Sequence, residues 1–180
     1  KDGKANQDDR GVSLDIDAAN NVYVVGSFSE SITFDNLHNN TALNAGFIVA
    51  FDANGNELWL DMVKAAQVAL TDIEVSASSL YITGDYKGNL SVIDNNNTNT
   101  YPTTSEYNIL VSKLTTTGDL NWLSSSISDN ELFSNQIAID PSNDVYIAGT
   151  FKCTYHGMNS IYGESTCRPV GFKDVHFQKY

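Results

Sequence analysis

Charge is scarce in this sequence, and most of it has one sign. Charged residues make up 18% of the 180 residues, and 22 acidic residues against 10 basic ones give a formal net charge of −12. A net negative charge of this size repels nucleic-acid phosphates and anionic lipid surfaces. The composition therefore argues against nucleic acid as a partner.

Long apolar runs are also missing. No run approaches the roughly 20 apolar residues that a membrane-spanning helix needs, so we expect no membrane insertion. The charged start Lys1-Asp2-Gly3-Lys4 does not have the pattern of a signal peptide.

Cysteine is limited to Cys153 and Cys167, which lie in a polar stretch without a C-x-x-C pair. We expect these two residues to form a short-loop disulfide, with two free thiols or a metal site as the alternatives. A disulfide implies an oxidising, extracytoplasmic setting.

The signatures of common catalytic sites are absent from the sequence. His38, His156 and His176 share no helical spacing, and there is no H-E-x-x-H motif that could hold zinc. There is also no G-x-S-x-G nucleophile motif and no glycine-rich phosphate loop between a strand and a helix. We therefore predict a protein without a catalytic site or a cofactor.

One pattern could hold a metal ion. The alternating oxygens of Asp52, Asn54 and Asn56 could bind calcium, but the glycine at position 6 and the glutamate at position 12 of a helix-loop-helix calcium loop are missing. A plain hairpin turn is the favoured interpretation, and calcium is the alternative.

Uncharged polar residues are abundant instead. The sequence has 20 Asn, 18 Ser and 14 Thr. These side chains hydrogen-bond to nearby backbone and so favour turns and sheet surfaces over helix interiors. The composition thus favours an all-β fold.

The sequence also repeats itself. Three segments, 14–28, 73–86 and 137–151, each read as an apolar strand, a short polar turn and a second strand that contains a glycine. The glycines Gly26, Gly84 and Gly149 are 58 and 65 residues apart, so one unit is about sixty residues long.

A second half-unit follows each of the first two hairpins. Segments 47–59 and 109–122 each place a turn glycine four residues before a tryptophan, Trp59 or Trp122. The third copy stops at Tyr180, before the expected turn and tryptophan. The predicted units are residues 1–62, 63–127 and 128–180, the last one truncated.

Each unit therefore has four short strands, which is typical of a β-propeller blade. Its sheet has apolar residues on both faces, as in 22–25, and needs a neighbour on each side to bury them. We predict an all-β protein of about three four-stranded antiparallel blades. Known propellers have roughly four to eight blades, so we expect a chain of about three blades to be a fragment of a longer polypeptide. Its expected partner is then the remainder of its own propeller. The residues expected to pack the blades are Tyr23, Gly26, Trp59, Tyr81, Gly84, Trp122, Tyr146 and Gly149.

Long polar insertions separate the second and third strands of the units, at 29–46, 87–107 and 152–171. Insertions of this kind gather at one rim of a propeller, where we expect any binding specificity. The tract 94–100, which is almost entirely Asn and Thr, is too polar to pack and is predicted to be a mobile loop tip.

These residues resemble the SBBP repeat family, which is named for seven-bladed β-propellers. The family unit reads D-x-x-G-N-x-Y-V-x-G-x-F, an insertion, then F-V-x-K-x-D-x-x-G-x-x-x-W, and segments 17–28 and 47–59 are similar to it. Asn20 stands where glycine is usual, and Ala50 replaces the lysine that Lys113 and Lys179 supply in the later copies. Two other propeller motifs, the tryptophan-docking motif of quinoprotein propellers and the sialidase Asp-box, match less of the unit.

The resemblance implies a large secreted or cell-surface bacterial protein, exported by a type IX pathway, and not a catalytic motif. We expect a non-enzymatic binding or adhesion scaffold that presents its insertions to a surface glycan or a protein partner. A propeller belonging to a secreted enzyme with its active site elsewhere, and a structural spacer or filament subunit, are the alternatives.

Overall fold

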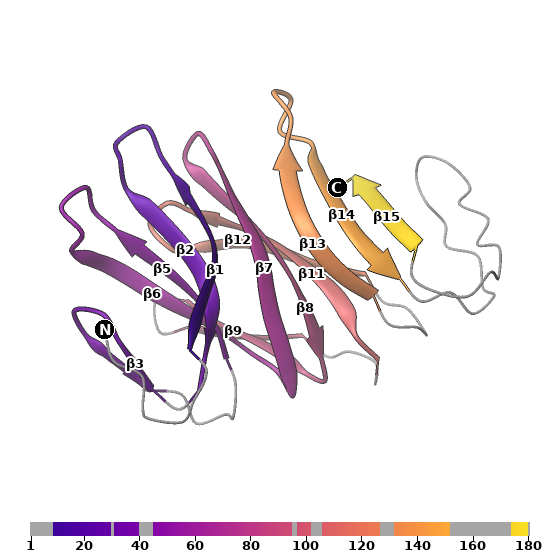
Figure 1. Ribbon diagram of the computed structural model, residues 1–180, viewed down its shortest axis with the longest axis horizontal. Coiled ribbons are helices and arrows are strands. Elements are labelled where there is room, and N and C mark those ends of the chain that lie inside the picture. Colours follow the sequence, from indigo (N-terminus) through magenta and orange to yellow (C-terminus); the bar gives the residue numbers. More distant parts are fainter. Residues whose placement is uncertain are drawn as a thin grey trace.

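The computed structural model of the chain consists of antiparallel β-strands (Figure 1). It describes residues 9–29, 31–39, 45–94, 97–101, 106–126, 132–151 and 174–179. The described residues form no helix, and hence none that could cross a bilayer. The predicted all-β class is confirmed. The strands are β1 (Arg10–Ile16), β2 (Val22–Phe28), β3 (Ser31–Thr33), β4 (Leu37–Asn39), β5 (Ala45–Phe51), β6 (Glu57–Lys64), β7 (Gln67–Ser76), β8 (Ser79–Lys87), β9 (Leu90–Asp94), β10 (Asn97–Tyr101), β11 (Asn108–Thr115), β12 (Leu120–Ser126), β13 (Leu132–Ile139), β14 (Val145–Phe151) and β15 (Asp174–Lys179).

The main strands fall into three successive meander units. Unit 1 contains β1, β2, β5 and β6, and unit 2 contains β7, β8, β11 and β12, each hydrogen-bonded in that order. Unit 3 contains β13, β14 and β15. The first strands of the units, β1, β7 and β13, lie side by side across the molecule (Figure 1). Among the described strands, no sheet closes on itself.

The first two insertions add hairpins to this framework. β3 pairs with β4, and β9 pairs with β10. β9 also pairs with β6 of unit 1, with Met62 opposite Ile93 and Val63 opposite Val92, so that unit 1 becomes part of a six-stranded sheet. A hairpin from the insertion of unit 2 thus extends the sheet of unit 1.

This pairing corrects the prediction of a loop tip at 94–100 for the described residues of the tract; residues 95 and 96 lie outside them. Asn97 to Tyr101 form β10, with Thr98 opposite Ile93 and Thr100 opposite Ser91. The polar sequence is compatible with a strand because β10 is the outermost strand of the sheet, and the side chains of Thr98 and Thr100 are exposed. β9 pairs with β6 on one side and with β10 on the other, so it supplies the strand partner that holds the polar tract in a β conformation.

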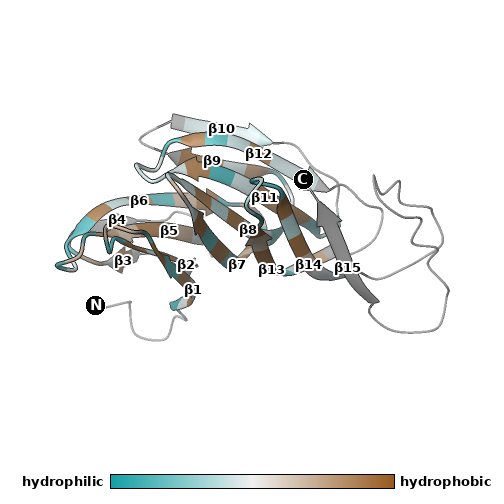
Figure 2. Ribbon diagram, turned by 90° about the horizontal axis from the view of Figure 1, so that it is seen from above, coloured by the Kyte–Doolittle hydropathy of each residue, from teal (hydrophilic) through white to brown (hydrophobic). Residues whose placement is uncertain are grey.

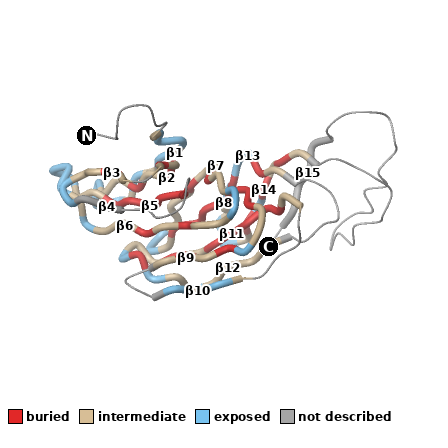
Figure 3. Tube along the Cα trace, turned by 90° about the horizontal axis from the view of Figure 1, so that it is seen from below, coloured by how far each residue is buried: buried red, intermediate tan, exposed pale blue. Residues whose placement is uncertain are grey.

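Most residues of β2, β5, β8 and β11 are buried (Figure 3), and these stretches are largely hydrophobic (Figure 2). In β2, Tyr23 and Val25 point toward unit 2, whereas Val24 and Phe28 lie on the opposite face under the β3–β4 hairpin. The burial of both faces explains the unbroken apolar run of the second strand.

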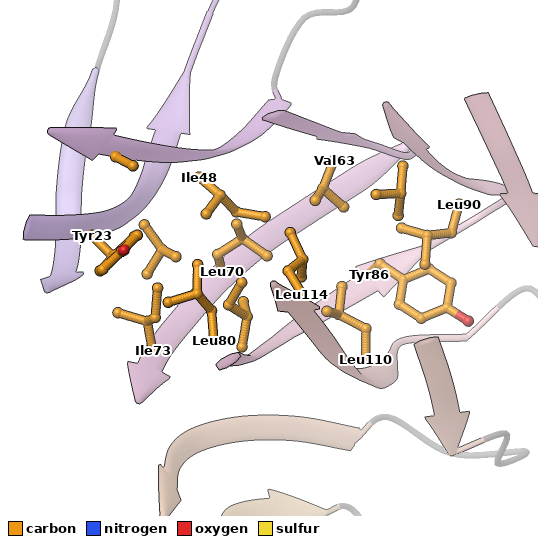
Figure 4. Close-up of a cluster of buried hydrophobic side chains, with 14 residues drawn as sticks. Tyr23, Ile48, Val63, Leu70, Ile73, Leu80, Tyr86, Leu90, Leu110 and Leu114 are labelled. Atoms are coloured by element: carbon orange, nitrogen blue, oxygen red, sulfur yellow. The ribbon is translucent and has the colours of Figure 1, made fainter. Parts of the chain in front are cut away.

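Three hydrophobic clusters follow from this arrangement. The largest fills the first interface, between units 1 and 2, with Tyr23 and Ile48 from unit 1 and Leu70, Ile73 and Leu80 from unit 2 (Figure 4). A second cluster, which includes Tyr81, Val111, Ile137, Val145 and Ile147, fills the second interface, between units 2 and 3. The third, with Phe28, Ile32, Ala45, Phe47 and Val49, packs the β3–β4 hairpin on unit 1.

Candidate functional site

The three repeat glycines occupy one and the same local geometry. Each lies on the second strand of its unit, opposite the residue that precedes a β-bulge on the first strand: Gly26 opposite Gly11, Gly84 opposite Leu70, and Gly149 opposite Ser134. The bulges fall at Val12, Thr71 and Asn135.

The bulge leaves no space for a side chain at these positions. A Cβ on Gly84 would lie 2.5 Å from the carbonyl oxygen of Ala69 and 3.0 Å from the Cα of Leu70. On Gly26 and Gly149 it would collide with the carbonyl oxygens of Arg10 and Phe133. Glycine thus permits the bulged first strand to lie against the second, which increases the twist of the strand pair.

Trp59 joins unit 1 to unit 2. Its indole Nε1 donates a hydrogen bond to the carbonyl oxygen of Thr116, at 3.0 Å, in the β11–β12 turn. The ring lies against Gly118 of the same turn and 6.2 Å from the ring of Tyr23. The aromatic edge of unit 1 therefore rests on the turn of the following unit.

Trp122 occupies the corresponding position in unit 2. Its ring lies 6.5 Å from that of Tyr81, in an edge-to-face arrangement, and it packs against the cluster of the second interface. The amino group of Lys113 lies 5.1 Å from the centre of the same Tyr81 ring. Tyr146, the third member of the tyrosine set, hydrogen-bonds through its hydroxyl to Asp140 at 3.1 Å.

Carboxylates of one unit accept hydrogen bonds from the first strand of the next. The Asp15 side chain accepts the Val75 amide at 2.7 Å across the first interface. The Asp72 side chain accepts the Ile137 amide at 2.9 Å across the second interface, and its other oxygen accepts the Ser13 hydroxyl at 2.7 Å. Because β7 and β13 are edge strands, these bonds satisfy amides that have no partner within their own sheets.

Asp85 acts in the same way but is more deeply buried. Its carboxylate accepts hydrogen bonds from both the amide and the hydroxyl of Ser134, and the Ser134 hydroxyl also lies 2.9 Å from that of Thr71. Burial raises the pKa of Asp85 to about 6, against the lowering effect of the bonds from Ser134. On β7, burial and then the charges of Asp15 and Asp72 raise the pKa of Glu74.

The candidate calcium ligands form a hairpin turn. The Asp52 carboxylate accepts the amides of Asn54 and Asn56, each at 2.9 Å, and the Asn56 side-chain amide at 2.8 Å. These bonds from Asn56, first from its side chain and then from its backbone, lower the pKa of Asp52. Asn54 and Asn56 thus donate N–H groups toward Asp52, in the arrangement of an Asx turn.

The same turn recurs at other hairpins. Asp17 accepts the amides of Ala19 and Asn21, and Asp140 accepts those of Ser142 and Asp144. The fourth residue of each of these three turns has a positive φ: Asn20, Gly55 and Asn143. Gly118 has one too, in the β11–β12 turn, where the Thr115 hydroxyl accepts the amides of Thr117 and Asp119. Asn20 and Asn143 can hold these positions because asparagine tolerates the left-handed conformation.

The bulges and the inter-unit carboxylates were missed by sequence reasoning. The glycine spacing was a visible signal of close backbone contact, but nothing in a single unit identifies Asp15, Asp72 or Asp85 as acceptors for a neighbour. Cys153, Cys167 and the insertion 152–171 lie outside the described residues. The described residues contain no cluster of His, Cys, Asp and Glu able to hold a metal ion.

No protein-family model matches this chain, and no curated protein matches it.

Proposed function

We propose that units 1 to 3 are consecutive blades of a β-propeller, and that the chain is a non-enzymatic binding scaffold of an extracellular or cell-surface protein. The observation that carries this proposal is the repetition of the same contacts at both interfaces. Ile73 of unit 2 packs against unit 1, and Ile137, at the equivalent repeat position of unit 3, packs against unit 2.

The arrangement of the first strands supports the propeller. β1, β7 and β13 are neighbours, and each carries a bulge opposite a glycine that increases local twist. In a propeller, corresponding strands of the blades gather around one axis in this manner. The bridging carboxylates of Asp15 and Asp72 then hold successive innermost strands together.

The roles of the acidic side chains support a scaffold over an enzyme. Asp17, Asp52 and Asp140 hold hairpin turns, whereas Asp72 and Asp85 accept amides of the following unit. Each of these carboxylates stabilises backbone geometry. An acid–base site would require carboxylates as well, but these five have structural roles.

The open edge at β10 is the surface that we assign to ligand binding. Thr98 and Thr100 point outward from the outermost strand, and Asn99 lies between them on the other face of the strand. Hydroxyl groups at an exposed sheet edge can hydrogen-bond to a neutral sugar, whereas the net charge of −12 disfavours an anionic one. The proposed ligand class is a neutral surface glycan.

A glycan array tests this assignment. The wild-type chain should bind neutral glycans, and the double variant Thr98→Lys/Thr100→Lys should lose that binding. The matched control is Asn54→Lys, which adds a charge to an exposed turn remote from β10 in sequence and should bind like wild type. Equal binding by wild type and the β10 variant would contradict the site, and the absence of any bound glycan would contradict the ligand class.

A structural spacer is the second candidate, because β9 of unit 2 extends the sheet of unit 1 and thereby couples neighbouring units mechanically. Capture of a protein, or turnover of a substrate, in place of glycan binding would favour a protein-binding module or an enzyme.

A further inference from the structure

β10 is the outermost strand of the six-stranded sheet, and no described strand pairs with its outer side (Figures 2 and 3). Its inner side pairs with β9 in an unbroken register, from Asn97 opposite Asp94 to Tyr101 opposite Leu90. An edge strand presents a row of backbone N–H and C=O groups with which another extended chain can pair. We call the outer side of β10 the open edge.

The register identifies the backbone groups at the open edge. Opposite residues of an antiparallel pair alternate between those that exchange hydrogen bonds and those that do not. Asp94 and Asn97 are paired with two residues between them, and a connection of that length closes on a hydrogen-bonded pair. The N–H and C=O groups of Thr98 and Thr100 therefore point away from β9, toward the open edge.

The other edge strands of the described sheets have features that discourage pairing, and β10 does not. A β-bulge, charged residues and a very short strand each blunt an edge. Four edge strands contain a bulge: β1 at Val12, β7 at Thr71, β12 at Asn121 and β13 at Asn135. β15 contains charged residues, and β3 and β4 have three residues each. β10 has five residues, no bulge, no charged residue and no proline, so it is the described edge best suited to accept a further strand.

The two faces of β10 differ, and they set the pattern of a strand that pairs with it. Thr98 and Thr100 are exposed, whereas Asn99 and Tyr101 are partly buried, and Tyr101 packs against the cluster of the first interface. Because side chains alternate between the faces of a sheet, an added strand places one set of side chains in solvent and the other set beside Asn99 and Tyr101. A segment that alternates charged and apolar residues fits both faces.

The charge of the chain indicates the sign of its partner. The net charge is −12, and β10 itself has no charged residue, so a cationic segment is attracted to the protein and meets no opposing charge on the strand. A second copy of the chain carries the same −12 and is repelled. A further unit of the same kind would stack on a sheet face, as at both described interfaces, and would leave the open edge uncovered.

We propose that the open edge binds an extended cationic segment of another protein, which joins the six-stranded sheet as a seventh strand beside β10. The backbone groups of Thr98 and Thr100 hold the segment, and its basic side chains lie on the exposed face. This binding mode is distinct from the proposed glycan site, because the glycan uses the hydroxyls of the two threonines and the segment uses their backbone.

The probe is a fluorescent eight-residue peptide that alternates lysine and valine, and fluorescence anisotropy measures its binding. The wild-type chain should bind it with a Kd of about 100 μM or lower at about 20 mM salt, and more weakly at about 500 mM salt because salt screens the attraction. The control is the same peptide N-methylated at every residue. It keeps the charge but has no backbone N–H, so its Kd should be about tenfold higher or more.

Three variants locate the site. Thr100→Pro removes one outward N–H and leaves the hydrogen bonds between β10 and β9, so it should keep the wild-type circular dichroism spectrum and raise the Kd for the peptide about tenfold or more. Thr98→Lys/Thr100→Lys keeps the backbone and should also weaken binding, because it adds positive charge at the edge. Thr98→Val/Thr100→Val removes the hydroxyls alone, so it should lose the glycan and still bind the peptide.

Equal binding of the plain and the N-methylated peptide would mean non-specific charge attraction and would overturn the proposal. Equal binding by wild type and both the proline and the lysine variants, or no binding at about 1 mM peptide, would overturn it as well. Wild-type dimers in light scattering that Thr100→Pro abolishes would assign the open edge to a second copy instead. Peptide binding without glycan binding would leave this proposal standing and contradict only the glycan ligand class.

Discussion

The indole of Trp59 donates its only N–H to the carbonyl oxygen of Thr116 across the boundary between units 1 and 2. The same ring covers Gly118, whose positive φ shapes the turn that presents this carbonyl. One side chain thereby fixes the outer end of one unit on the turn of the next.

Replacing Trp59 with phenylalanine should lower the free energy of unfolding by about 1 kcal/mol beyond the loss of ring area, because the Thr116 carbonyl loses a donor. Urea denaturation followed by circular dichroism measures the change. Trp122→Phe is the matched control, since the Trp122 indole has only ring packing among the described residues. Equal effects of the two substitutions would mean that the hydrogen bond contributes nothing.

Gly26 and Gly11, opposite each other in the β1–β2 pair, should respond differently to alanine. Gly26→Ala forces a Cβ into the Arg10 carbonyl oxygen and the Phe47 ring, so we expect the free energy of unfolding to fall by about 2 kcal/mol or more. A Cβ on Gly11 would meet only the Cγ1 of Val24, at 3.5 Å, an ordinary contact. Gly11→Ala should therefore be neutral or slightly stabilising. Chemical denaturation of both variants measures the free energy of unfolding. A Gly26→Ala variant as stable as wild type would contradict the predicted collision of its Cβ.

Asp85 makes the second interface sensitive to pH. Its folded-state pKa of about 6 lies above the ordinary value of 3.8, so the folded state binds the proton more tightly than the unfolded state. The resulting stabilisation is complete below pH 3.8 and is lost as the pH rises through 6. Its size is about 3 kcal/mol or less, from the difference between the two pKa values.

Asp85→Asn removes this dependence while keeping a carbonyl that can accept the Ser134 amide. The variant should be more stable than wild type at pH 7.5, and this advantage should disappear at pH 4. Urea titrations of both proteins at the two pH values measure the difference in their free energies of unfolding. A constant difference between the proteins across this range would show that Asp85 has an ordinary pKa.

Two buried tyrosines should show opposite responses to removal of the hydroxyl. The Tyr86 hydroxyl is buried and has no hydrogen-bond partner among the described residues, so Tyr86→Phe should raise the free energy of unfolding by about 1 kcal/mol. The Tyr23 hydroxyl donates to Asp17 at 3.0 Å, and burial, followed by the bond and charge of Asp17, raises the pKa of Tyr23 to about 12. Tyr23→Phe should accordingly be destabilising. Thermal and urea denaturation compare the stabilities of the two variants with that of wild type. A destabilised Tyr86→Phe variant would mean that the Tyr86 hydroxyl has a hydrogen-bond partner.

Much of the strand pattern could be read from single segments. The apolar runs at 22–28 and 80–86 and the turn sequence at 17–21 are local signals, because alternation, β-branched residues and Asx turns act within a few residues. The calcium pattern at Asp52 was equally local, and its plain-turn interpretation agrees with the hydrogen bonds that Asp52 accepts.

The insertions were harder to predict for a physical reason. The tract 94–100 contains almost no apolar side chain, and its strand conformation depends on β9, which in turn depends on β6 from another unit. Likewise, Asp15 and Asp72 look like ordinary surface carboxylates until β7 and β13 are placed beside them. The strand partner of β9 lies about 30 residues away in sequence, and the amides bound by Asp15 and Asp72 lie 60 and 65 residues away, so none of these partners leaves a mark on the local pattern.

The amino-acid sequence alone determined the all-β class and the repeating strand–turn–strand unit with its recurring glycine, because these depend on backbone conformation and on residues close in the chain. Only the tertiary structure decided which unit covers which face, which edge β9 extends, and that β10 is the outermost strand of its sheet. These outcomes depend on contacts between units, and a contact between distant surfaces is fixed only when both are in place.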